Sequence, residues 1–187
     1  MLHAEAWRPA AAGTPLTSTG QRTPDVFERL FLEEYSKVVA IAYRVLADRH
    51  AAEDVAQEVF LQFHRSQAAG SERAAGWLHA AAVHSALNMI RGERRRVKRD
   101  TAHAAAEGAA RVDNPEHLVV EAEQRREVRQ ALSRLPEKAA AILVLRYSGL
   151  SYAEVAVALR IKVGNVGTML RRAEEALRKE VRRATSE

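Results

Sequence analysis

The sequence predicts an all-α fold made of two small helical domains. Apolar residues recur at steps of three and four positions through most of the chain, as in amphipathic helices, and no segment alternates as a strand would. Of the 187 residues, 47% are hydrophobic but only 5% are aromatic. This mixture favours helices packed through alanine and aliphatic side chains over a β-sandwich. An Ala- and Gly-rich segment without an apolar face divides the chain into two parts.

These patterns divide the chain into four parts. We expect a disordered tail at 1–24, a helical domain at 25–99, a flexible linker at 100–117 and a second helical domain at 118–187. In the first domain, one helix starts at Asp25, a second covers about 51–65, and a third begins near Glu72 and runs into a basic stretch, 91–99. The second domain is expected to hold helices at about 116–133, 136–147, 151–159 and 163–182.

Charge and composition limit the classes of protein to be considered. The net charge of +5 points to a polyanionic partner. The absence of cysteine excludes disulfides, thiolate metal sites and cysteine nucleophiles. No apolar run approaches the roughly 18 residues of a membrane span, and the N-terminus lacks the pattern of a signal peptide. We therefore expect a cytoplasmic protein with no membrane partner.

Residues 150–170 have the pattern of a helix-turn-helix. Ser151 precedes Glu154 by three positions, which predicts a capping box at the start of a short helix. A turn at 160–162 follows, and Val163, Val166 and Leu170 then form the apolar side of a second helix. The outward side of that helix carries cationic and amide or hydroxyl groups suited to phosphates and base edges, at Lys162, Asn165, Thr168, Arg171 and Arg172. From spacing alone, an ordinary helical hairpin with a solvated basic face is the alternative.

The wider sequence around this motif resembles region 4 of the extracytoplasmic-function (ECF) group of the sigma-70 family of RNA polymerase sigma factors. The resemblance covers ALSRLPEKAAAILVLRYSGLSYAEVAVALRIKVGNVGTMLRRAEEALRKE, residues 131–180. In that family the domain binds the −35 promoter element with its second helix in the major groove. The resemblance implies that the five outward residues of 162–172 face the DNA.

Several residues of the motif depart from the family pattern. Arg160 stands where glycine is common, and a positive φ there costs a non-glycine residue on the order of 1 kcal/mol. Lys162 replaces the usual capping serine, and Gly167 and Met169 replace residues that are commonly basic. Gly164 and Gly167 each weaken a helix by roughly 0.8–1 kcal/mol relative to alanine. We therefore expect a recognition helix that is less stable and less basic than usual.

The N-terminal domain resembles region 2 of the same family. Regions 2.1 and 2.2 correspond to FERLFLEEYSKVVAIAYRVLADRHAAEDVAQEVFLQFHR, with the strongest match at 52–60. In family members this helix docks on the clamp helices of the β′ (beta-prime) subunit of RNA polymerase, which implies a docking role for Asp54, Gln57 and Glu58. Taken alone, these three would be interpreted as a solvated acidic face.

The stretch from Gly76 to Arg99 resembles regions 2.3 and 2.4, which open and read the −10 element. Extruding a base costs a few kcal/mol, which a pocket and neutralised phosphates offset. His84 and Asn88 stand where the family often has Asn and Asp, so the −10 preference is not carried over from relatives. Trp77 is expected to anchor the core and not to stack on a base. The candidate −10 residues are His84, Asn88, Arg91, Arg94, Arg95 and Arg96.

Together the two resemblances predict a sigma factor that directs core RNA polymerase to specific promoters. The partners implied are core polymerase, through its β′ clamp helices and β (beta) flap, promoter DNA and, as a further candidate, an anti-sigma factor. The alternatives are a sigma-like adaptor that no longer selects promoters, and a helix-turn-helix repressor without affinity for polymerase. We expect no enzyme, metal or cofactor, because the histidines lack ligand spacing and no phosphate-binding loop or nucleophile elbow occurs.

Overall fold

The computed structural model describes residues 24–66, 73–103 and 116–185. These residues form seven α-helices and no strand, which confirms the all-α prediction. The helices are α1 (Pro24–Leu46), α2 (Arg49–Arg65), α3 (Ala74–His103), α4 (Glu116–Arg134), α5 (Glu137–Tyr147), α6 (Tyr152–Leu159) and α7 (Val163–Thr185). The expected tail lies outside the described residues apart from Pro24. So does the part of the expected linker at 104–115, and α3 continues past position 99 to His103.

Helices α1, α2 and α3 form the N-terminal half, a bundle around a fully buried core that includes Ile41, Phe63 and Leu78. At the end of the bundle that holds the start of α1, aromatic rings of α1 and α2 pack against one another, and the centroids of Phe31 and Phe60 are 4.9 Å apart. Trp77 lies in this core with its ring centroid 5.4 Å from that of Phe63. The structure therefore supports Trp77 as a core anchor.

Helices α4 to α7 form the C-terminal half, in which α5 is the central helix. Six consecutive residues of α5, 140–145, are buried. A helix that is buried on every side needs partners all around it. Helices α6 and α7 cover part of α5, and α3 and α1 of the other half cover the rest.

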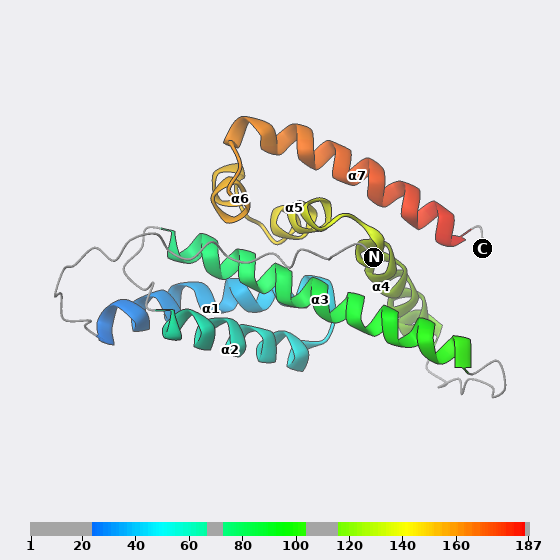
Figure 1. Cartoon of the computed structure of the whole chain (residues 1–187), viewed down its shortest axis with the longest axis horizontal. Helices are drawn as coiled ribbons and strands as arrows, with labels where there is room; N and C mark the ends of the chain where they lie inside the picture. The colour runs from blue at the N-terminus through cyan, green and yellow to red at the C-terminus, as the bar shows by residue number, and fades with distance from the viewer. Residues whose placement is uncertain (1–23, 67–72, 104–115, 186–187) are drawn as a thin grey trace.

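The two halves pack directly against each other. Helix α3 crosses the middle of the molecule, with α1 and α2 on one side and α4 to α7 on the other (Figure 1). It contacts α4, α5 and α6, and one continuous hydrophobic core includes residues from both halves. The backbones of α3 and α6 approach closely at Gly76, where an added Cβ would lie 2.6 Å from Val157 Cγ1 of α6. We call this packing of α4–α7 on α3 the closed arrangement.

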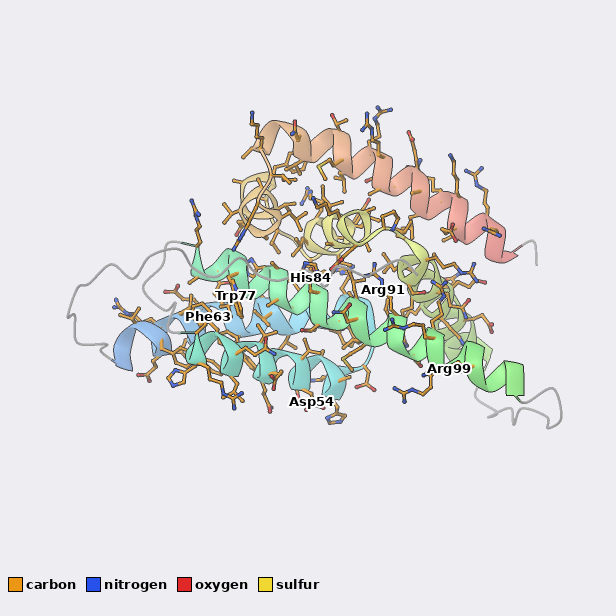
Figure 2. All side chains as sticks on the ribbon, viewed as in Figure 1. Asp54, Phe63, Trp77, His84, Arg91 and Arg99 are labelled. Carbon is orange, nitrogen blue, oxygen red and sulfur yellow. The ribbon has the colours of Figure 1, made fainter. Side chains whose placement is uncertain are left out.

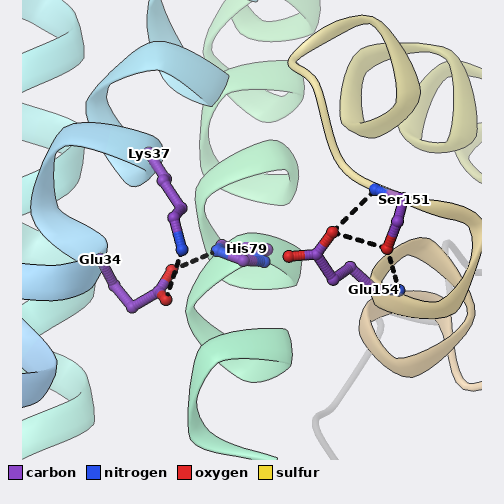
Figure 3. A network of polar contacts seen from close by, with 5 residues as sticks. All are labelled: Glu34, Lys37, His79, Ser151 and Glu154. Atoms are coloured by element: carbon purple, nitrogen blue, oxygen red, sulfur yellow. Dashed lines mark hydrogen bonds and ion pairs between the residues drawn. The ribbon is translucent and has the colours of Figure 1, made fainter.

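A buried polar cluster lies where α6 approaches α3. His79 Nε2 is 2.7 Å from Glu34 Oε2 of α1, and Lys37 Nζ is 2.8 Å from Glu34 Oε1. This hydrogen bond from Lys37 is the main reason why the pKa of Lys37 is raised above 10.5. Figure 3 shows the His79 ring between Glu34 and the Glu154 carboxylate of α6. The buried Nδ1 of His79 has no hydrogen-bond partner, so His79 is a polar residue at the contact between the halves.

Candidate nucleic-acid interface

The helix-turn-helix is formed by α6, the turn at 160–162 and the start of α7. The predicted capping box is confirmed: Ser151 Oγ accepts from the Glu154 backbone N–H at 3.3 Å, and the Ser151 N–H donates to Glu154 Oε2 at 2.7 Å. The Ser151 hydroxyl and N–H thereby hold the pKa of Glu154 below 4.5. At the other end of α6, Arg160 has φ 53° and ψ 47°, the left-handed conformation expected of this turn position. The strain predicted for Arg160 is therefore present.

The turn fixes how α7 leaves α6. The Ile161 N–H donates to the Ala156 carbonyl at 3.0 Å, and the Ile161 side chain packs against the core. In α7, Val166 and Leu170 are buried against the rest of the C-terminal half. Tyr147 ties α5 to α7, because its hydroxyl donates to Glu174 Oε1 at 2.9 Å, and this bond is the main cause of the raised pKa of Tyr147. The start of α7 is thus held from one side only.

The opposite side of α7 is open to solvent. The five side chains predicted to face DNA in the C-terminal half are all exposed: Lys162, Asn165, Thr168, Arg171 and Arg172. Arg171 is 3.6 Å from Glu175 one turn further on, and both side chains remain largely exposed. An exposed pair of this kind contributes little to stability, so Arg171 can exchange Glu175 for a phosphate at small cost. Helix α7 lies at the edge of the molecule, away from α1 and α2 (Figure 1).

On α3 the candidate residues fall into two groups. Asn88, Arg95 and Arg96 are exposed. Three others are engaged by the C-terminal half: His84 Nδ1 pairs with Glu137, Arg91 donates to the Leu135 carbonyl at 3.1 Å, and Arg94 donates to the Ser133 carbonyl at 3.0 Å. Of these, His84 and Arg91 are half-buried, and Arg94 remains exposed. Figure 2 shows His84 and Arg91 on the side of α3 that carries α4 and α5. In the closed arrangement, three of the six predicted −10 residues thus form contacts with the C-terminal half.

Helix α2 presents a polar face on the far side of the N-terminal half. Asp54, Gln57 and Glu58 are exposed, while Val55, Ala56 and Val59 on the other side are buried. Asp54 points away from α4–α7 (Figure 2). The helix begins earlier than the sequence suggested, because the Asp48 side chain accepts from the Ala51 N–H at 2.9 Å and caps it at Arg49. This face is exposed to solvent, while the other side of α2 packs on α1 and α3.

Sequence reasoning missed the groups that join the halves. Glu137, the carbonyls of Ser133 and Leu135, and the pair Glu34–His79 carried no recognised motif. Tertiary packing decides which acidic side chain or backbone carbonyl becomes the partner of such a residue, so the local sequence does not indicate it. Within the described residues no group of three or more His, Asp or Glu side chains could hold a metal ion. No described helix has both the length and the apolar character required to cross a membrane.

Two family models match the two halves of the chain, and several known proteins are similar to most of its length. The family model described as "Sigma-70 region 2" matches residues 30–96, and that described as "Sigma-70, region 4" matches residues 125–177. The chain is 31% identical over 156 residues to ECF RNA polymerase sigma factor SigW of Bacillus subtilis, covering 78% of this chain and 83% of that protein. It is 30% identical over 161 residues to ECF RNA polymerase sigma-E factor of Escherichia coli, covering 81% and 84%. A solved structure of the sigma factor RpoE in complex with the anti-sigma factor NepR from Bartonella quintana matches with a TM-score of 0.49 and 18% identity, covering 83% of this chain and 96% of that one.

A helix-turn-helix with an exposed basic face, joined to a helical bundle that matches region 2, defines a transcription initiation factor of the sigma-70 type. The chain belongs to the ECF sigma factors of the sigma-70 family. It is a sigma factor that directs core RNA polymerase to promoters for transcription initiation, and proteins of this class are initiation factors and not enzymes.

Proposed function

We propose that this sigma factor connects polymerase and promoter, in the cytoplasm, through three separate surfaces. The polar face of α2, with Asp54, Gln57 and Glu58, docks on the clamp helices of the β′ subunit. The exposed face at the start of α7 binds the −35 element, and α3 reads the −10 element. The β flap is proposed to contact the C-terminal half, and an anti-sigma factor remains a further proposed partner.

The observation that carries this proposal is the one-sided exposure of α7. The buried Val166 and Leu170 fix the helix, while Asn165, Thr168, Arg171 and Arg172 of α7 and Lys162 of the preceding turn are exposed. Arginine and lysine neutralise phosphates and position the protein, whereas an asparagine or threonine that reaches a base edge specifies sequence. We assign phosphate contacts to Lys162, Arg171 and Arg172, and base contacts to Asn165 and Thr168.

The −10 surface requires a change of arrangement. His84, Arg91 and Arg94 are bound to the turn and helix ends between α4 and α5 in the closed arrangement. We propose that these contacts separate when polymerase and promoter bind, which frees all six candidate side chains of α3. Arg91 and Arg94 lose two hydrogen bonds to carbonyl oxygens in this step and gain contacts to phosphates, and hydrogen bonds to a charged acceptor are the stronger kind.

Run-off transcription with core polymerase tests the docking surface. Asp54→Ala should reduce transcription and binding to core polymerase together, while binding of the free protein to −35 DNA is unchanged. Glu123→Ala, which removes an exposed acid of α4 outside the three surfaces, is the matched control and should leave both intact. Specific DNA binding without any association with core polymerase would contradict the docking role.

A second pair of variants tests the −35 surface. Arg171→Ala should weaken binding of −35 DNA and reduce the slope of log affinity against log salt by about 1, as loss of one phosphate contact does. Lys179→Ala removes an exposed cation two turns further along α7 and serves as the control. An equal loss of affinity in both variants would show that α7 attracts DNA only by its general charge.

A further inference from the structure

A cavity between α3 and α4 is lined by arginines from both halves of the molecule. Its volume is about 690 Å³, within the range of small-molecule sites. Five guanidinium groups line it, from Arg94 of α3 and from Arg125, Arg126, Arg129 and Arg134 of α4. Among the described residues of its wall, Glu93 is the one acid. The cavity exists only in the closed arrangement, because both helices form its wall.

The positive charge of this cavity is only partly compensated. Glu93 is bound to Arg129 at 3.0 Å, and Arg134 lies 3.9 Å from Glu180 of α7. Arg126 forms no hydrogen bond or ion pair within the described part of the chain. A smaller cavity of about 350 Å³ adjoins the first, shares Arg94 and Arg134 with it, and adds Arg183. Six arginines and two acids line the two cavities. Arg125 and Arg183 also interact with other residues, so the uncompensated charge is assigned to Arg126 and to Arg94, whose described bond is to a carbonyl oxygen.

The geometry points to a binding site for a compact polyphosphate, and we propose that a chain of three or more phosphate groups, free or carried by a nucleoside, occupies it. Guanidinium groups bind phosphate oxygens through paired hydrogen bonds, and several of them are needed to replace the hydration of a multiply charged anion. A single phosphate would compensate only part of the charge, whereas a short chain of phosphates reaches arginines on both walls.

Such a ligand would hold the two halves together. Arg94 belongs to α3, and Arg126, Arg129 and Arg134 belong to α4, so an anion between them makes attractive contacts with both. The ligand binds the closed arrangement and not an arrangement in which α4–α7 have separated from α3. It therefore shifts the population towards the closed arrangement. This regulatory consequence rests on the proposed role of α3 at the −10 element, because Arg94 is one of the residues involved. Binding of the anion to the cavity does not depend on that proposed role.

Calorimetric titration of the full chain with inorganic tripolyphosphate tests the site. We expect one equivalent to bind, and the double variant R126A/R129A to bind at least tenfold more weakly. The control R65A/K138A removes two exposed cations that do not line either cavity. Equal weakening in both double variants, or no saturable binding, would overturn the proposal. A nucleoside triphosphate in a parallel titration separates the two sources, since tighter binding than tripolyphosphate would assign the nucleotide.

Transcription assays keep this proposal separate from the proposed function. Without polyphosphate, R126A/R129A should support run-off transcription, because neither residue belongs to the three surfaces. With tripolyphosphate at saturation and constant ionic strength, transcription by the unaltered protein should fall, while that by R126A/R129A should fall less. Inhibition of equal size in both would show that the anion acts elsewhere and would overturn the regulatory role of the cavity.

Discussion

At the turn between α6 and α7, the Arg160 backbone lies in the left-handed region, with φ 53° and ψ 47°. This conformation costs a residue with a Cβ about 1–2 kcal/mol, and glycine removes that cost while adding some entropy to the unfolded chain. We expect Arg160→Gly to raise the free energy of unfolding by up to about 1 kcal/mol, measured by denaturant titration. Gly149, at φ 97°, gives the opposite test, since Gly149→Ala should lower it. A loss of stability in Arg160→Gly would mean that the arginine side chain contributes more than its backbone costs.

His84 gives the molecule a titratable group between α3 and α5. Burial lowers its pKa below 6.5, although the neighbouring Glu137 acts in the opposite direction. The imidazole of His84 therefore binds a proton more readily in the unfolded chain than in the folded one. The free energy of unfolding is thus highest above pH 6.5 and decreases as the pH falls from 6.5 towards the lower pKa of His84 in the folded chain. Thermal unfolding between pH 7.5 and 5 should show this loss, and His84→Gln should flatten it. His50→Gln, at an exposed histidine, is the control, and an identical pH profile for His84→Gln would contradict the prediction.

Single residues were predictable where their structure is set by near neighbours in the sequence. The capping box of Ser151 and Glu154 and the strained turn at Arg160 depend on a few adjacent positions, and both are present. Ala47, between α1 and α2, also has a positive φ, of 54°, but nothing in its sequence indicates it. The buried contact of His79 with Glu34 joins residues 45 positions apart and has no local signal either.

At the scale of the helix, Gly167 weakens the recognition helix without a packing requirement. A Cβ at this position would lie 3.6 Å from Tyr152 Cε2, an ordinary van der Waals contact. Gly167→Ala should therefore stabilise α7 by about 0.8–1 kcal/mol and raise the Tm by a few degrees. Gly92→Ala on α3, where nothing lies within 4 Å of the added Cβ, is the matched comparison. If Gly167→Ala lowers the Tm while Gly92→Ala does not, the Tyr152 ring cannot move to accommodate the added methyl group.

Helix positions were predicted closely because amphipathic spacing and caps are local properties. The expected helices at 136–147, 151–159 and 163–182 agree with α5, α6 and α7 to within three residues at each end. Helix α2 begins two residues before its expected start because the Asp48 cap was not recognised. The periodicity also gave the candidate faces of α2 and α7, both of which are exposed in the structure. Whether these faces bind polymerase and DNA stays a prediction.

At the scale of the whole molecule, sequence reasoning did not predict that the halves pack together. One signal was present: α5 is apolar on every side, and the C-terminal half alone covers only part of it. The remaining cover comes from α3 and α1, so the buried face of α5 contributes to holding the closed arrangement. Amphipathic spacing shows which side of a helix is buried but not which distant helix buries it. For this reason the partners of His84, Arg91 and Arg94 could not be identified.

The contact between Gly76 and α6 offers a direct test of the closed arrangement. A Cβ at Gly76 would lie 2.6 Å from Val157 Cγ1 and 3.4 Å from the Ala158 backbone nitrogen, so we expect the branched side chain of Gly76→Ile to push α6 away from α3. Overpacking of this kind costs about 1–3 kcal/mol, which should populate a separated arrangement. Because the chain has no cysteine, labels at Ser36→Cys of α1 and Lys179→Cys of α7 report the distance between the halves by energy transfer.

We expect Gly76→Ile to lower the transfer efficiency between these labels and to make the −10 face of α3 more accessible to single-stranded promoter DNA. Gly76→Ala should have a smaller effect, and adding Val157→Ala to it should restore the transfer efficiency, because the clashing methyl group is then absent. Circular dichroism distinguishes separation from unfolding, since the helices themselves should persist. If Gly76→Ile leaves the transfer efficiency unchanged while the helices stay folded, the halves of the free protein are not held together through α3 and α6.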